Sequence, residues 1–108
     1  IGGMGLNGGI QDAVNLTDKL AAVIADGEDE CLMDLYDKQR RTFAVEFVQE
    51  QTIANKKRLE ATDPEARATN MQNLRDMASD PAKARNFLLG ASMIAAMRRN
   101  AEVMLEDA

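Results

Sequence analysis

Glycine is concentrated at the start of the chain, where Gly3, Gly5 and Gly8 match the pattern G-x-G-x-x-G. In dinucleotide-binding folds these glycines let the backbone approach a pyrophosphate, and the pattern follows a β-strand and opens a helix. A helix is expected after the glycines here, and Asp26 lies near the place of the acidic residue that binds the ribose. The strand is missing, because one residue precedes Gly2. The missing strand therefore disfavours a pyrophosphate loop.

The same glycines allow a different chemistry at the end of a helix. Asn7 is a good N-cap residue, and Gly8 and Gly9 would then occupy a first turn without side chains. A planar ligand could lie against the exposed N–H groups of that turn, where the helix end adds about half a positive charge. The alternative is a frayed glycine arm at a chain end. The residues alone leave both interpretations open.

Side chains that commonly carry catalysis or bind metals are scarce. The chain has no His, which removes the commonest general base and the commonest metal ligand. Cys31 lies on an expected helix, and we expect a small buried apolar residue rather than a nucleophile. The clustered charges indicate an acidic first turn and solvated helix faces: Glu28, Asp29 and Glu30, then Lys56, Lys57 and Arg58, then Arg98 and Arg99. We therefore assign no catalytic residue and no metal ligand.

About four helices are predicted to carry these residues. The Asp-Pro pairs at Pro64 and Pro81 are typical of helix starts, and Gly27 is typical of a helix end. Apolar residues at helical spacing predict helices over residues 8–26, 29–60, 64–78 and 81–105, the second of them long. No segment shows the alternation of a strand. The predicted fold class is all-α, in a single domain or a part of one.

Composition and charge narrow the functional classes. The 108 residues are 45% hydrophobic but only 4% aromatic, which suits a helical core. The net charge of −5 argues against nucleic acid as the main partner. The longest nearly apolar run, residues 87–97, is shorter than the ~20 residues that span a bilayer. The single Cys fits a reducing compartment, and we expect a cytoplasmic location. The chain begins at Ile1, and we expect it to be cut from a longer protein.

A longer spaced pattern extends from the glycines into the first helix. It reads Gly3-x-Gly5-x-Asn7-x-Gly9-x-x-Asp12-Ala13-x-Asn15-Leu16-x-x-Lys19-Leu20. This run resembles the last flavin-binding motif of the FAD-dependent aromatic hydroxylases. These are single-component flavoprotein monooxygenases related to para-hydroxybenzoate hydroxylase and the ubiquinone-pathway hydroxylases. The stretch LMDLYDKQRR at residues 32–41 resembles the segment that commonly follows, with its Tyr and paired Arg.

The resemblance implies a cofactor site in the first residues of the chain. The cofactor-binding residues would be Gly3, Met4, Gly5, Leu6 and Asn7, the last three presenting their backbone to the pyrimidine side of the isoalloxazine ring. Residues 1–9 would form a glycine-rich, flavin-contacting loop, and residues 10–108 the helical C-terminal region. The parent enzyme would hydroxylate an aromatic small molecule with O₂, using FAD as cofactor and NAD(P)H as electron donor.

The resemblance also assigns supporting roles and shows departures. Asp12 and Asn15 would hold the loop and helix in place rather than touch substrate. Asp18 replaces an aromatic residue often seen in the motif, and the dinucleotide-binding strand and the Gly-Asp-Ala segment before the motif are absent. We therefore expect a C-terminal fragment that is inactive alone and retains no FAD.

A self-contained helical interaction or oligomerisation module without catalytic activity is the alternative. The fourth predicted helix is apolar nearly all round in its middle, at Phe87, Leu88, Ala91, Ile94 and Ala95. The second predicted helix is too long for its partners to cover. Both features predict self-association, with a homodimer as the commonest closed form.

Overall fold

The computed structural model describes residues 2–106, and every regular element in that range is a helix. The elements are α1 (Met4–Asp26), α2 (Cys31–Phe43), the π-helical segment η1 (Ala44–Gln49), α3 (Glu50–Leu59), α4 (Pro64–Ser79), α5 (Pro81–Ala91) and α6 (Ile94–Glu102). The predicted all-α class is confirmed. Within the same range, no helix combines the length and the apolar character needed to cross a membrane.

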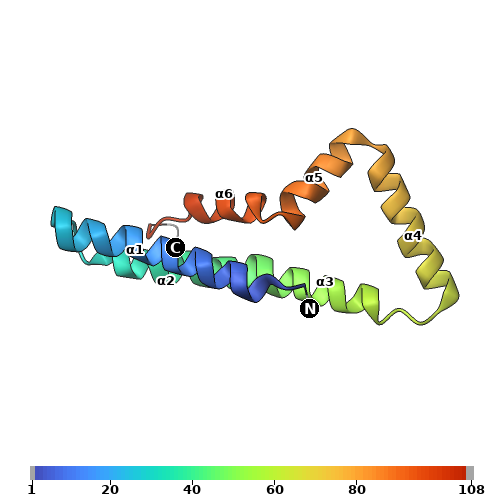
Figure 1. Cartoon of the computed structure of the whole chain (residues 1–108), viewed down its shortest axis with the longest axis horizontal. Helices are drawn as coiled ribbons and strands as arrows, with labels where there is room; N and C mark the ends of the chain where they lie inside the picture. Colours follow the sequence, from blue (N-terminus) through green and yellow to red (C-terminus); the bar gives the residue numbers. More distant parts are fainter. Residues whose placement is uncertain (1, 107–108) are drawn as a thin grey trace.

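The helices form an elongated, open arrangement (Figure 1). α1 runs antiparallel to a long rod made of α2, η1 and α3, and α4 leads away from the end of that rod. α5 then turns back, and α6 packs along α2. The principal extents are 59 × 27 × 26 Å and the radius of gyration is 17.8 Å. A compact domain of this size has a radius of gyration of about 13 Å, so much of this chain lies outside any common core.

The residues that mark helix ends in the sequence mark them in the structure. Gly27 has a φ of 70°, and the N–H of Glu28 donates to the carbonyl of Ala22 at 3.1 Å, as in a Schellman motif. Asp63 and Asp80 each precede a Pro, and each side chain accepts backbone N–H groups from the first turn of the following helix. These three predicted boundaries are confirmed.

The long second helix is also confirmed, as a continuous rod from Cys31 to Leu59. Its middle, η1, is wound more loosely than an α-helix, which no Gly or Pro in the sequence indicates. Glu46 lies in η1 and accepts from Arg99 of α6, with Nε to Oε2 at 3.1 Å and Nη2 to Oε1 at 3.3 Å. This pair joins the rod to α6.

The first helix begins earlier than predicted. α1 starts at Met4 rather than near Gly8, so Asn7 lies inside the helix and is not its N-cap. Of the expected loop over residues 1–9, Gly2 and Gly3 precede the helix, and residues 4–9 are helical; Ile1 lies outside the described residues. Gly3 takes the N-cap position with a φ of 65°, a left-handed conformation that suits glycine.

The fourth predicted helix, residues 81–105, is wrong as a single element. It is divided into α5 and α6 by Met93, which has a φ of 65°. Left-handed backbone at a non-glycine residue costs roughly 1–3 kcal/mol. Met93 is buried, and its Sδ accepts from Nε2 of Gln11 in α1 at 3.4 Å. Burying a Met side chain stabilises by about 1.5–3 kcal/mol, which offsets the strain of the break.

Few apolar side chains are buried within the described chain. The buried ones are Phe43, Met93 and Val103, on α2 and on either side of α6. Large apolar side chains remain exposed on every α-helix except α2: Leu6, Ile10, Val14, Leu20, Ile24, Ile53, Leu59, Met71, Leu74, Phe87, Leu88, Ile94 and Met97. Exposed apolar side chains this numerous are typical of a chain that another surface covers.

Candidate functional site

The five residues predicted to bind a cofactor lie together in and before the first turn of α1. Gly3 is the N-cap, and Met4, Gly5, Leu6 and Asn7 follow as helical residues. No side chain caps this helix end, and no acidic residue lies in its first turn. Its N–H groups therefore keep their donor capacity, and the positive end of the helix dipole is not neutralised.

The surface around this turn is open. A Cβ built on Gly3, Gly5 or Gly9 would meet no atom within 4 Å. The side chain of Leu6 is 76% exposed. A flat ligand with hydrogen-bond acceptors on its edge can thus approach the backbone directly, and negative charge on that edge would be stabilised.

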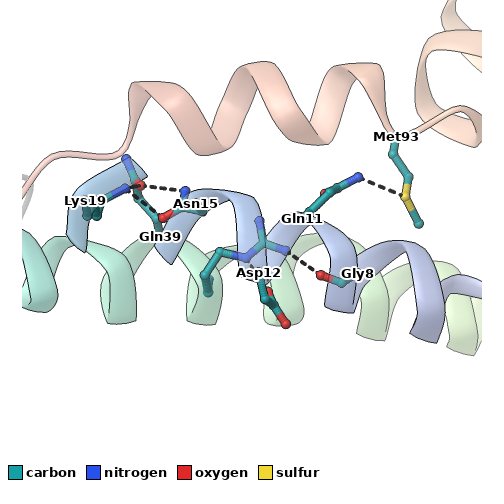
Figure 2. A network of polar contacts seen from close by, with 8 residues as sticks. Gly8, Gln11, Asp12, Asn15, Lys19, Gln39 and Met93 are labelled. Carbon is teal, nitrogen blue, oxygen red and sulfur yellow. Dashed lines mark hydrogen bonds and ion pairs between the residues drawn. The ribbon is translucent and has the colours of Figure 1, made fainter. Parts of the chain in front are cut away.

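One turn further along, α1 is fastened to α2 by Arg40. Nε of Arg40 donates to Oδ1 of Asp12, and Nη2 donates to the carbonyl of Gly8 at 3.5 Å. Figure 2 draws the contact to Gly8 next to Asp12. The guanidinium carbon lies 4.2 Å from the centroid of the Phe43 ring, and a Cβ on Gly8 would lie 3.8 Å from that ring. The resemblance implies that Asp12 holds the loop and helix in place, and in the structure it does so by binding Arg40 of α2.

A second polar cluster joins α1, α2 and the end of α6 (Figure 2). Oε1 of Gln39 accepts from Nδ2 of Asn15 at 3.0 Å and from Nζ of Lys19 at 2.8 Å. Lys19 also donates to Oδ1 of Asn15 at 2.7 Å, and Nε2 of Gln39 donates to the carbonyl of Val103 at 3.1 Å. Gln39 is buried, and both its amide oxygen and its amide nitrogen have hydrogen-bond partners. Through its bond to Gln39, Asn15 also binds a neighbouring helix.

Burial of Lys19 within this cluster lowers its pKa, and the nearby positive charge of Arg40 lowers it further. The Asp18 carboxylate opposes both effects. The ammonium still donates to two amide oxygens. Lys19 thus holds the side chains of Asn15 and Gln39 in place relative to each other.

A hollow of about 470 Å³ lies between α1, α2 and α6, and Gln11, Asn15, Lys19, Gln39, Met97 and Asn100 are among its lining residues. Two buried oxygens there, Oε1 of Gln11 and Oδ1 of Asn100, have no hydrogen-bond partner among the described residues. Buried acceptors usually bind protein groups or ordered water.

The remaining candidates from the sequence do not form a reactive centre. Cys31 is exposed rather than buried, which corrects the expectation of a buried apolar residue. Hydrogen bonding to Asp29 raises the pKa of the Cys31 thiol, and the backbone N–H of Cys31 lowers the pKa of Asp29. Across residues 2–106 no group of three or more acidic or Cys side chains is placed to hold a metal ion.

Sequence reasoning missed the residues on the partner helices. Gln39 and Met93 were not singled out, and Arg40 was noted only as half of an Arg pair. The usable signal lies on α1, where Asp12, Asn15 and Lys19 follow at intervals of three and four residues and so share one helix face. A polar stripe on a helix with few other polar neighbours indicates a partner helix that carries complementary groups.

The family model described as FAD binding domain matches residues 1–51. Over 89 residues the chain is 35% identical to para-nitrophenol 4-monooxygenase of Pseudomonas sp. (strain WBC-3), covering 82% of this chain and 22% of that protein. Over 88 residues it is 34% identical to 6-hydroxy-3-succinoylpyridine 3-monooxygenase of Pseudomonas putida, covering 81% and 22%. Over 43 residues it is 54% identical to a putative polyketide hydroxylase of Streptomyces coelicolor, covering 40% and 7%.

The chain thus spans about a fifth or less of the length of these relatives. No solved structure matches it.

Proposed function

We propose that the first turn of α1 contacts the isoalloxazine ring of FAD. The premise is that this chain is a fragment of an FAD-dependent aromatic hydroxylase. Gly3, Met4, Gly5, Leu6 and Asn7 are the contact residues, through their backbone. The observation that carries the proposal is the bare helix end. No side chain caps it, and no neighbouring atom lies within 4 Å of where a Cβ on Gly3 or Gly5 would stand.

The donor set of this turn suits the pyrimidine edge of a flavin. That edge carries carbonyl oxygens, which accept from N–H groups, and the reduced ring carries negative charge, which a helix N-terminus stabilises. When bound, FAD supplies the oxygen-transfer chemistry, and the protein supplies orientation and electrostatics. The residues of this chain orient the ring edge and offer no acid, base or nucleophile of their own.

The enzyme of which this chain is a part inserts one oxygen atom from O₂ into an aromatic substrate, with NAD(P)H as electron donor. The names of the relatives support this reaction class, since they are monooxygenases and a hydroxylase of nitrophenol, pyridine and polyketide compounds. The nicotinamide donor and the unpaired Cys31 favour a cytoplasmic enzyme. The chain alone would be inactive, because the fragment spans a small part of such an enzyme.

Hydrogen exchange in the full-length protein that contains this chain tests the flavin contact. Adding FAD to the apoprotein should slow amide exchange of residues 4–7 by about tenfold or more, since a contact of ~1.4 kcal/mol changes an equilibrium tenfold. The first turn of α4, residues 65–67, is the matched control, because it is also a helix start but is capped by Asp63. Equal exchange of residues 4–7 with and without FAD would remove them from the site.

The exposed apolar surface favours a second property, self-association of the chain when it is isolated. Leu88 and Ile94 line an apolar hollow between α5 and α6 and are exposed. In the full enzyme other parts of the protein would cover such a surface, and in isolation a two-fold dimer is the commonest closed solution. The same surface is the basis of the alternative function, a helical interaction module.

Light scattering over micromolar concentrations should therefore give a dimer mass for the isolated chain. Ile94→Asp should dissociate the dimer, because an unpaired charge in an apolar interface is strongly disfavoured. Ile24→Asp on α1 is the control, since Ile24 is 79% exposed on a helix that neither of the two features predicting self-association involves, and the substitution should leave the dimer intact. A monomer mass at every concentration would refute self-association.

A further inference from the structure

Two adjacent arginines of α2 lie in opposite environments. The side chain of Arg40 is 9% exposed, and that of Arg41 is 73% exposed. Arg41 pairs with Asp37 of its own helix at 2.8 Å, one turn away. Exposed pairs of this kind contribute little to stability. The side chain of Arg40 instead reaches across to α1 and binds there. A buried guanidinium is stable only where its N–H groups have acceptors in good geometry.

Arg40 holds the backbone of α1 as well as a side chain. It binds the carboxylate of Asp12, and its Nη2 donates to the carbonyl of Gly8 at 3.5 Å. The guanidinium also stacks on Phe43, a residue that is 5% exposed and whose ring lies 3.8 Å from where a Cβ on Gly8 would stand. Ion pair, carbonyl contact and stacked ring thus act on the second turn of α1, directly behind its open N-terminus.

The position of these contacts matters because a helix is stiff over a few residues, so holding its second turn also fixes the direction of its first turn. Gly8 follows Met4 by one turn, about 6 Å along the axis at 1.5 Å per residue. No neighbouring atom lies within 4 Å of where a Cβ on Gly3 or Gly5 would stand, so we expect the direction of the first turn to depend mainly on the turn behind it. A misplacement of about 1 Å at a reacting or binding group can cost a factor of about a hundred.

We propose that Arg40 is a positioning residue for the flavin: by holding Asp12 and the carbonyl of Gly8, it aims the N–H groups of the first turn of α1 at the ring. This inference rests on the proposed function, since it names the group that orients the flavin contact. Arg40 acts through α1 and has no part in the chemistry. Lys could replace the charge, but its ammonium lacks the planar fork that holds a carboxylate and a carbonyl in fixed directions at the same time.

The test compares variants of the full-length holoenzyme that contains this chain. Arg40→Met removes the charge and the bonds, and Arg41→Met removes the same charge at the next residue. Arg40→Lys tests rescue. Three quantities are measured for each: the Kd of FAD by titration of the apoprotein, the midpoint potential of bound FAD, and the urea midpoint of the apoprotein.

Arg40→Met should weaken FAD binding at least about tenfold, and Arg41→Met less than about twofold. The reduced flavin should lose about tenfold more affinity than the oxidised flavin, because the helix end stabilises its negative charge. For a two-electron couple this lowers the midpoint potential by about 30 mV. Arg40→Lys should recover part of both effects. A merely structural role would move the urea midpoint and leave the potential unchanged.

Asp12→Asn covers the case in which Arg40→Met does not fold. It keeps the shape of the partner and removes its charge, and it should produce the same two shifts at smaller size. The inference is overturned if the Arg40 or Asp12 variants that fold match Arg41→Met in Kd and potential, or if they weaken binding without changing the potential. If FAD instead leaves the exchange of residues 4–7 unaffected in the wild type, the proposed function itself fails, and the two failures are distinguishable.

Discussion

Replacing Phe43 with alanine should lower the free energy of unfolding of the chain by about 3–5 kcal/mol, the range for a buried Phe in a packed site. Phe43 is the only aromatic residue among the buried ones in the described part of the chain. Its ring lies 5.3 Å from that of Phe47, 4.2 Å from the guanidinium carbon of Arg40, and 3.8 Å from where a Cβ on Gly8 would stand. The substitution therefore removes the contact surface on which α1 meets the rod.

Urea unfolding followed by far-ultraviolet circular dichroism measures this loss. Ile24→Ala is the control, because Ile24 on α1 is 79% exposed and lies outside the α5–α6 surface proposed for self-association. Exposed positions usually change stability by less than about 0.5 kcal/mol, so the control should stay near the wild type. Equal destabilisation by the two substitutions would show that Phe43 is not the centre of the packing.

Helix boundaries were predictable wherever the chain itself supplies the reason. Gly27 ends α1 with a positive φ, and Asp63 and Asp80 cap the helices that follow them. Local chemistry decides these positions, and the sequence displays it. The long rod was predictable for the same reason, since nothing between Cys31 and Leu59 interrupts it.

The break at Met93 and the early start of α1 were not predictable in this way. Met93 leaves the helical conformation because its side chain is buried against α1, and that contact joins residues far apart in the sequence. Met4 to Gly9 are helical although three glycines oppose it. The second turn of this segment is fastened by Arg40 and Phe43, which only the tertiary structure brings to it. Tertiary contacts decide both cases.

The resemblance to FAD-dependent aromatic hydroxylases, drawn from the spaced glycines and the Asp12 and Asn15 positions, is confirmed by the match of residues 1–51 and by the relatives. The motif includes Asp12 and Asn15 but does not show which residues they contact. In the structure its polar members bind α2, through Arg40 and Gln39. The run that resembles the flavin-binding motif therefore includes residues that hold two helices together.

Gly5→Val should abolish most FAD binding by the full-length protein while leaving this chain folded. A Cβ at Gly5 meets nothing within 4 Å, and Val is a better helix former than Gly, so neither packing nor helix stability suffers. A branched side chain would nevertheless stand between the ring and the backbone. We expect the Kd of FAD to rise about a hundredfold, equivalent to ~3 kcal/mol.

Gly90→Val supplies the matched control for this substitution. Gly90 lies inside α5, and a Cβ there also meets nothing within 4 Å. The two variants therefore make the same change in the same kind of backbone, at opposite ends of the described chain. Any general effect of placing Val in a helix appears equally in both.

Contact between the bare first turn of α1 and the flavin is tested by the FAD affinity of these two variants, measured by titration of the apoproteins of the full-length enzyme. Gly5→Val should bind FAD about a hundredfold more weakly than the wild type, whereas Gly90→Val should bind it with unchanged affinity. Wild-type affinity in Gly5→Val would contradict the account, because a ring in contact with that backbone leaves no room for the side chain.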